Sequence, residues 1–166
     1  MSTFTSGPPL RKSQVIRLLE EIGRKLGFEV AHDPQKESRI NRLLDDLARL
    51  DVVWYKELPE PLGKVIIAAF EVIDKAISVK ELKGNFFNLQ HASCGIGVIV
   101  APLRDLREGR VKVPSIWQSY FKSGRFEREL NALAKATAIT SNIKIMDYSD
   151  VNDLAKRLDI EIVNEN

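Results

Sequence analysis

The chain has 166 residues, of which 44% are hydrophobic and 29% charged, and its formal net charge is +2. These values are typical of a globular protein whose length corresponds to one domain with a substantial core. No apolar run approaches the roughly 20 residues that span a bilayer, so we expect no membrane partner. The small net charge neither demands nor forbids a nucleic-acid partner.

Residues 1–12 are predicted to form a flexible lead-in, and residues 13–166 a single domain. The first residues are small and polar and lack the charged and then apolar build of a signal peptide, which predicts a cytoplasmic location. Cys94 is the only cysteine, so the chain has neither an intrachain disulfide nor a cysteine-rich metal site.

The first predicted element is a helix with Ser13 as its N-cap and Gly27 as its end. Glu20 and Glu21 lie on it, either as a solvated face or with one of them turned toward a functional site. A short extended piece at 28–30 follows. After a turn at 32–34, a second amphipathic helix is predicted over residues 35–49.

Two apolar strands come next, and each carries an acid. The first covers about 50–56 and has Asp51 at its head, and the second covers 65–74 and has Glu71 near its end. The loop between them is too short for a helical crossover, so the strands should be antiparallel neighbours. That pairing would bring Asp51 and Glu71 to the same end of the sheet.

The rest of the chain alternates helices and strands. A helix over 78–91 leads to a strand over 95–102, which should lie parallel to the strand over 65–74 after a right-handed crossover. A helix over 127–138, a strand over 142–148 and a helix over 151–158 complete the order. The sequence therefore predicts an α/β fold, with a mixed central sheet of about four strands flanked by helices on both faces.

Two converging carboxylates indicate a site for a hard divalent cation, magnesium or manganese, which takes carboxylate oxygens and keeps several waters. Such a metal polarises a phosphate and generates the attacking hydroxide, while a nearby lysine stabilises the developing charge. Asp51 and Glu71 are the predicted metal ligands.

The run Asp51-Val52-Val53-Trp54, followed by Ala69-Phe70-Glu71-Val72, resembles the signature of uncharacterised microbial members of the P-D…(D/E)-x-K superfamily of nucleases, also called restriction-endonuclease-like. The order of elements from about 13 to 148 is similar to the core of that family. The resemblance implies a metal-dependent endonuclease that cleaves nucleic acid, with DNA as the first expectation, and it allows a homodimer. Asp51 and Glu71 would be catalytic as metal ligands.

The chain departs from the family where the lysine should stand, two residues after Glu71, because Ile73 occupies that position. Lys75 is one substitute, if the strand continues that far, and Lys83 on the following helix is another, as is Lys80. Ile73 favours an alternative, a catalytically degenerate member of the fold that acts as a nucleic-acid-binding or assembly module. In a third interpretation the two acids only form ion pairs at the sheet edge.

Two further stretches have polar patterns. Asn85, Asn88 and His91 follow the spacing of one helix face and are either substrate-facing or ordinary surface. The residues from Trp117 to Arg128 mix aromatic and basic side chains, which either stack on bases and contact phosphates or pack in the core.

Overall fold

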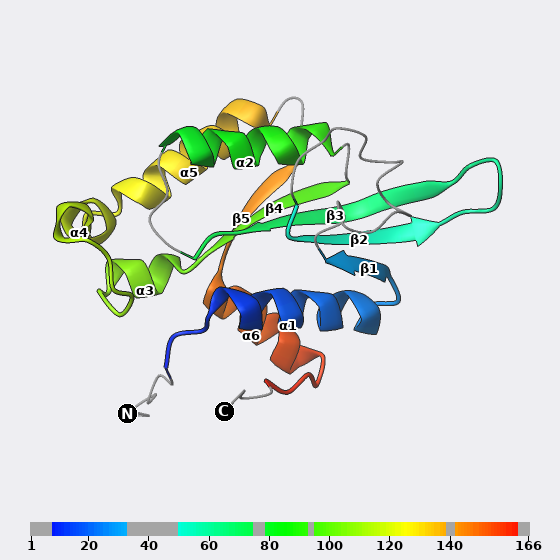
Figure 1. Cartoon of the computed structure of the whole chain (residues 1–166), viewed down its shortest axis with the longest axis horizontal. Coiled ribbons are helices and arrows are strands. Elements are labelled where there is room, and N and C mark those ends of the chain that lie inside the picture. Colours follow the sequence, from blue (N-terminus) through cyan, green and yellow to red (C-terminus); the bar gives the residue numbers. More distant parts are fainter. Residues whose placement is uncertain (1–7, 33–49, 75–78, 93–94, 139–141, 163–166) are drawn as a thin grey trace.

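The computed structural model describes residues 8–32, 50–74, 79–92, 95–138 and 142–162. Within these ranges the chain forms an α/β fold in which helices cover both faces of a five-stranded mixed sheet (Figure 1). The strands are β1 (Glu29–His32), β2 (Val52–Glu57), β3 (Lys64–Val72), β4 (Ile96–Ala101) and β5 (Ile143–Asp147). The helices are α1 (Lys12–Lys25), α2 (Val79–His91), α3 (Leu103–Arg107), α4 (Ser115–Lys122), α5 (Arg125–Thr137) and α6 (Tyr148–Arg157).

The strands lie in the sheet in their chain order, from β1 to β5. β2 is antiparallel to β1 and β3, and the pairs β3/β4 and β4/β5 are parallel. The predicted antiparallel pairing of β2 with β3 and the predicted parallel pairing of β3 with β4 are therefore confirmed. The predicted number of strands was too low, because the short extended piece after α1 pairs with β2 as a strand of four residues. The predicted helix over 35–49 lies outside the described residues.

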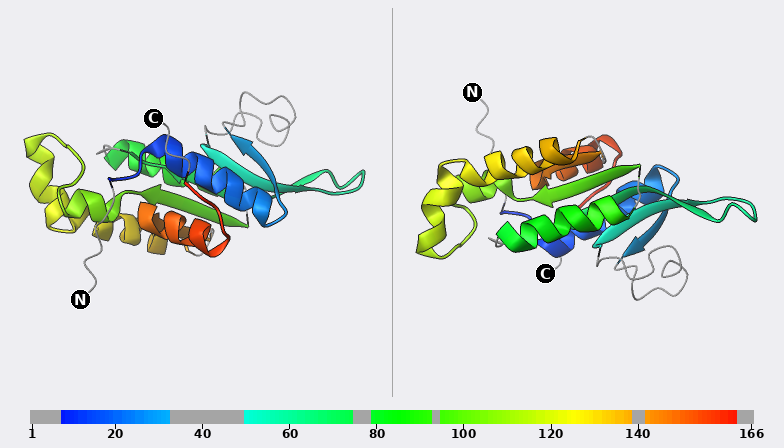
Figure 2. Two further views of the ribbon diagram at one scale, coloured as in Figure 1. Left: turned by 90° about the horizontal axis from the view of Figure 1, so that it is seen from below. Right: turned by 90° about the horizontal axis from the view of Figure 1, so that it is seen from above.

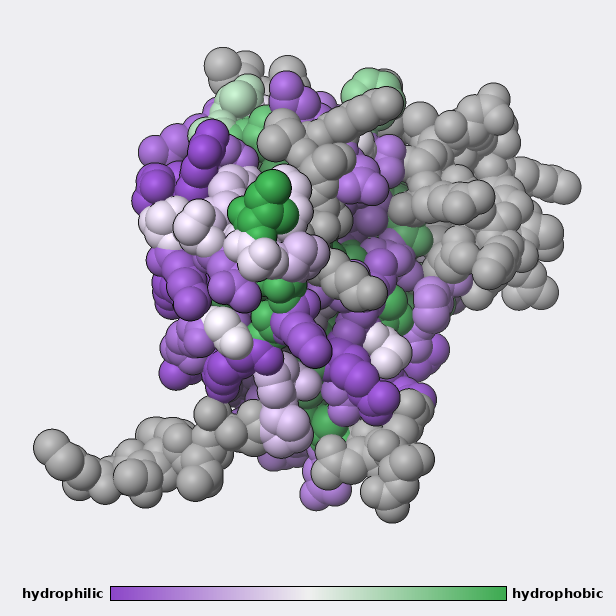
Figure 3. Space-filling model, turned by 60° about the vertical axis from the view of Figure 1, so that its left-hand side comes forward, coloured by the Kyte–Doolittle hydropathy of each residue, from purple (hydrophilic) through white to green (hydrophobic). Residues whose placement is uncertain are grey.

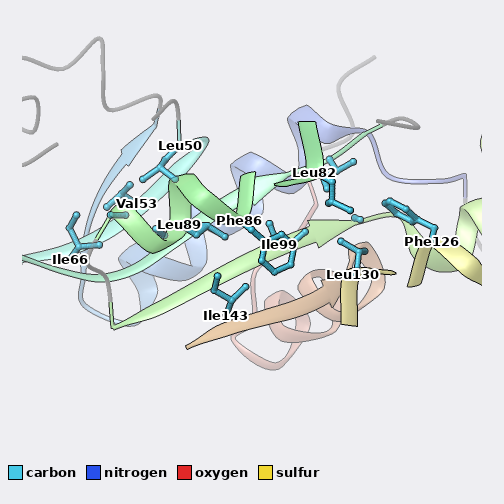
Figure 4. Close-up of a cluster of buried hydrophobic side chains, with 14 of the residues drawn as sticks. Leu50, Val53, Ile66, Leu82, Phe86, Leu89, Ile99, Phe126, Leu130 and Ile143 are labelled. Carbon is cyan, nitrogen blue, oxygen red and sulfur yellow. The ribbon is translucent and has the colours of Figure 1, made fainter. Parts of the chain in front are cut away.

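Two apolar clusters hold the layers together. α2 and α5 cover one face of the sheet, while α1 and α6 cover the other (Figures 1 and 2). On the first face, Leu82, Phe86 and Leu89 of α2 gather with Ile99 of β4 and Leu130 of α5 (Figure 4). α3 and α4 lie beyond the carboxyl ends of the parallel strands (Figure 1). In the described part of the chain, no helix has the length and apolar character to cross a membrane.

The ends of α1 differ partly from the prediction. The N-cap is Arg11 and not Ser13, since the backbone N–H of Arg11 donates to Oε1 of Gln14 over 2.8 Å. Ser13 therefore lies inside the first turn. At the other end, Gly27 takes a φ of +85°, a left-handed conformation that glycine adopts without steric cost, and it follows the helix as predicted.

Trp54 of β2 joins the sheet to α1. Its indole Nε1 donates to the carbonyl oxygen of Leu19 over 2.9 Å, and its ring lies 4.6 Å from that of Phe70. The indole fills the space beside Gly23, where a Cβ would lie 2.5 Å from Nε1 of Trp54 and 2.8 Å from Cγ2 of Val30. α1 therefore packs directly against Trp54 at Gly23, and no side chain larger than a hydrogen atom fits at this position.

We expect Gly23→Ala to lower the free energy of unfolding by about 1–3 kcal/mol, because overpacking outweighs the better helix propensity of alanine. Gly84→Ala in α2 is the matched control. No atom lies within 4 Å of a Cβ built there, so this change should stabilise by up to about 1 kcal/mol. Urea denaturation of both variants measures the two effects. Equal stabilisation by both would contradict the close approach of Trp54.

Candidate functional site

Asp51 and Glu71 converge at one end of the β2–β3 ladder. Val52 pairs with Phe70, and the N–H of Asp51 donates to the carbonyl oxygen of Phe70 over 3.1 Å, so Asp51 stands opposite Glu71. The N–H of Val72 donates to Oδ2 of Asp51 over 2.8 Å. The convergence that the sequence predicts for these two acids is present in the structure.

Glu71 is a buried carboxyl group, only 5% exposed. It shares the α2 face of β3 with Ala69 and Ile73, and Nδ2 of Asn88 in α2 donates to its Oε1 over 3.3 Å. Burial, followed by the neighbouring Asp51 carboxylate, raises the pKa of Glu71 from 4.5 to about 8, against the opposing effects of Asn88 and Lys12. Ionisation of Glu71 is therefore unfavourable while Asp51 carries a negative charge beside it.

Among the described residues, Lys12 is the cation that contacts Asp51. It lies in the first turn of α1, and its Nζ lies 3.3 Å from Oδ1 of Asp51. Both side chains keep contact with solvent, with exposures of 36% for Lys12 and 23% for Asp51. No sequence pattern indicates Lys12, because it lies far from both acids in the chain and only the packing of α1 against the sheet brings it to Asp51.

The lysines expected from the motif lie elsewhere or are not described. Ile73, at the position where the resemblance predicts a lysine, is 4% exposed and packs in the apolar core. Lys75 and the side chain of Lys80 lie outside the described residues. Lys83 is exposed on α2, about 140° around the helix from Asn88 at 100° per residue. The structure therefore does not bring Lys83 to the α2 face that contacts Glu71.

A cleft of about 600 Å³ opens beside Lys12. Asp74 and Tyr148 also line it, together with Arg11 and Pro102, whereas Asp51 and Glu71 do not. The hydroxyl of Tyr148 donates to the carbonyl oxygen of Ile73 over 2.5 Å. Burial and then the Asp74 carboxylate raise the pKa of Tyr148, so the phenol stays protonated at neutral pH and secures the chain just after β3. Lys12 thus connects the cleft to the acids.

Of the other polar and aromatic residues singled out in the sequence, one contacts the site and the rest of those described lie away from it. Among the predicted polar helix residues, Asn88 contacts Glu71, whereas the side chain of His91 lies outside those described. Glu20 contacts Nδ1 of His32 over 3.0 Å, an ion pair whenever the imidazole is protonated, at the edge strand β1. Phe121 and Phe126 are buried in the core, while Trp117 keeps 36% exposure on α4.

Asp51 and Glu71 are the two acids that could offer oxygen ligands to a metal ion at this site. In the part of the chain that the structure describes, no group of three or more His, Cys, Asp or Glu side chains could hold a metal ion. A metal held by Asp51 and Glu71 alone would need water or a phosphate as its other ligands. This composition suits magnesium and manganese, which take oxygen ligands, better than zinc, which prefers a closed set of nitrogen and sulfur ligands.

Comparison with known proteins gives no family: no family model, no curated protein and no solved structure matches the chain.

The raised pKa of Glu71 makes stability depend on pH. Between about pH 4.5 and 8 the unfolded chain has released the Glu71 proton while the folded chain retains it, so the free energy of unfolding should fall by a few kcal/mol across this window. In Glu71→Gln this fall should disappear, and at pH 8 the variant should be more stable than the wild type. Urea denaturation at several pH values tests this, with Glu57→Gln on the exposed end of β2 as the control. A wild-type profile equal to that of Glu71→Gln would contradict the burial of this carboxyl group.

Proposed function

We propose that the chain is a magnesium- or manganese-dependent nuclease of the restriction-endonuclease-like type, with Asp51 and Glu71 as metal ligands and Lys12 as the catalytic cation. The observation that carries this proposal is a buried glutamate opposite an aspartate, with one lysine at the partly exposed end of the pair. The lysine two residues after the glutamate, which the family resemblance requires, is replaced in space by Lys12.

An ordinary structural ion pair accounts for only half of this arrangement. Lys12 partners Asp51, whereas Glu71 contacts the neutral amide of Asn88 and, when protonated, shares a hydrogen bond with the Asp51 carboxylate. Burying a second carboxyl group beside Asp51 destabilises the fold whenever both are ionised. A divalent cation between them would remove that penalty, which explains why the acids are kept together.

The residues around the acids have separate tasks in this proposal. The Val72 N–H holds the Asp51 carboxylate, and the Asn88 amide orients that of Glu71. When bound, the metal would polarise the phosphate and lower the pKa of its water. Lys12 lines the cleft, where its ammonium group would stabilise negative charge that develops on the phosphate oxygens.

A second candidate function is a catalytically degenerate member of the same fold that binds nucleic acid without cutting it. Ile73 is the observation that favours it, because an apolar side chain fills the family's lysine position. Lys12 decides between the two candidates, since it either replaces the missing lysine or only neutralises Asp51.

We expect magnesium or manganese to bind saturably, measured by calorimetry, and to raise the melting temperature at pH 8. Asp51→Asn and Glu71→Gln should each abolish both effects. These substitutions remove charge while keeping side-chain size, and Glu71→Gln also relieves a buried charge, so loss of metal binding would not reflect unfolding. Binding that persists in both variants would contradict the assignment of the metal ligands.

We expect cleavage of DNA or RNA in magnesium or manganese, and Lys12→Met should lower its rate at least about a hundredfold while metal binding persists. Lys25→Met, in the last turn of the same helix, makes the same charge change away from the site and should cleave as the wild type does. Nucleic-acid binding without cleavage in either metal would favour the degenerate module. Metal binding without any effect on nucleic acid would contradict both candidates.

A further inference from the structure

A second concavity, between α3 and α4, is lined by basic side chains. Its volume is about 240 Å³, and its lining consists of Leu106, Gly109, Arg110, Val111, Lys112, Val113, Gln118 and Lys122. The lining thus contains three cationic side chains and one amide but no carboxylate. A cavity of this size and charge suits a tetrahedral anion such as a phosphate group.

The three cations are not equivalent. Arg110 is held by Asp105 over 2.8 Å and by Glu108 over 3.0 Å, which fixes its position and offsets its charge. Among the described residues, no carboxylate forms an ion pair with Lys112 or Lys122. The stem of Lys122 lies against the turn at Gly109, where a Cβ would lie 3.7 Å from its Cε. Two lysines are therefore available to an anion, beside an arginine whose position is fixed.

The basic cavity shares a residue with one other concavity and a helix with another. Val111 lines both the basic cavity and the cleft that contains Lys12. α4 contributes Gln118 and Lys122 to the wall of the basic cavity, and Trp117 and Tyr120 to a third concavity of about 390 Å³. The surface at the α3–α4 end of the molecule is largely hydrophilic with small hydrophobic spots (Figure 3).

The third concavity has the character of a stacking surface. Ile116 is 80% exposed and Trp117 36% exposed, and the Arg125 guanidinium carbon lies 5.7 Å from the centre of the Tyr120 ring. Trp117 and Tyr120 meet edge to face, with ring centres 5.5 Å apart. Exposed aromatic rings bordered by arginine stack on unpaired bases, whatever the base. In a duplex the base faces are covered, so this surface suits a single strand.

We propose that the α3–α4 cavity binds a backbone phosphate of a single-stranded nucleic acid, with one base of that strand stacked on Trp117. The path of the strand rests on the proposed function, which places the cleaved phosphate in the cleft at Lys12. From there the strand runs across Val111 to the basic cavity. Lys112 and Lys122 neutralise the phosphate, and Gln118 donates to one of its oxygens. The site would thus select single-stranded substrates.

The test measures binding without metal, so that it does not depend on cleavage. A short labelled single-stranded oligonucleotide is titrated in chelator against the wild type and the double variant Lys112→Gln/Lys122→Gln. We expect the double variant to bind at least about tenfold more weakly and the slope of log affinity against log salt to decrease by about 0.7, because one neutralised phosphate is lost. Lys25→Gln/Lys156→Gln is the matched control, because it makes the same charge change at the exposed ends of α1 and α6 and should bind as the wild type does.

Stacking has its own readout. The chain has two tryptophans, and Trp54 is buried. Quenching of tryptophan emission by an unlabelled strand should therefore come from Trp117 and disappear in Trp117→Phe. Quenching that persists in this variant would overturn the stacking assignment.

Three results would overturn the phosphate site: no oligonucleotide binding, an equal loss in the control variant, or equal affinity for duplex and single strand. A free phosphate ion could occupy the same cavity as a backbone phosphate, and inorganic phosphate is the probe for that alternative. If it displaces the strand at low concentration through the two lysines, the cavity binds free phosphate and the strand assignment is wrong. Failure of this inference and failure of the nuclease proposal are distinguishable. Strand binding that depends on the two lysines, without cleavage by the wild type, supports the phosphate site and contradicts only the nuclease.

Discussion

The antiparallel register of β2 and β3 is the constraint on which the site depends. Val52 and Phe70 pair and pack into the cluster under α1 and α6, whereas Val53 and Ala69 pack into the cluster under α2 and α5. Because both faces of these strands are buried, a slip of one residue would turn every apolar side chain to the wrong cluster. The core therefore fixes the register, and the register places Asp51 opposite Glu71.

That placement works against stability. A glutamine at position 71 would keep the hydrogen-bonding capacity of the side chain toward Asn88 and Asp51 without the ionisable group. A fold under selection for stability alone has no use for a second carboxyl group beside Asp51 in the core. Natural proteins accept such destabilising groups where a site requires them. The energetic conflict at Glu71 thus supports the proposal that the pair of acids forms a site.

The sequence predicts the part of the site that lies on two neighbouring strands joined by a short loop. β2 and β3 are identifiable because each is an apolar run, so the convergence of Asp51 and Glu71 follows from a short loop and strand geometry. Asn88 carries a weaker signal, its place on a polar helix face. β1 is too short and too mixed in burial to be recognised, and Lys12 reaches the site only because α1 packs on the sheet. Contacts between layers have no local pattern in the sequence.

The position of the lysine can be explained by the same packing. Glu71 and Ile73 project to the same side of β3, into the cluster under α2, where Ile73 is 4% exposed. A lysine there would have to keep its ammonium group charged in an apolar environment, and desolvation would lower its pKa. Lys12 approaches from the opposite layer, at the rim of a cleft, and remains 36% exposed beside the Asp51 carboxylate. The rim of the cleft is therefore the side from which a lysine reaches the acids without being buried.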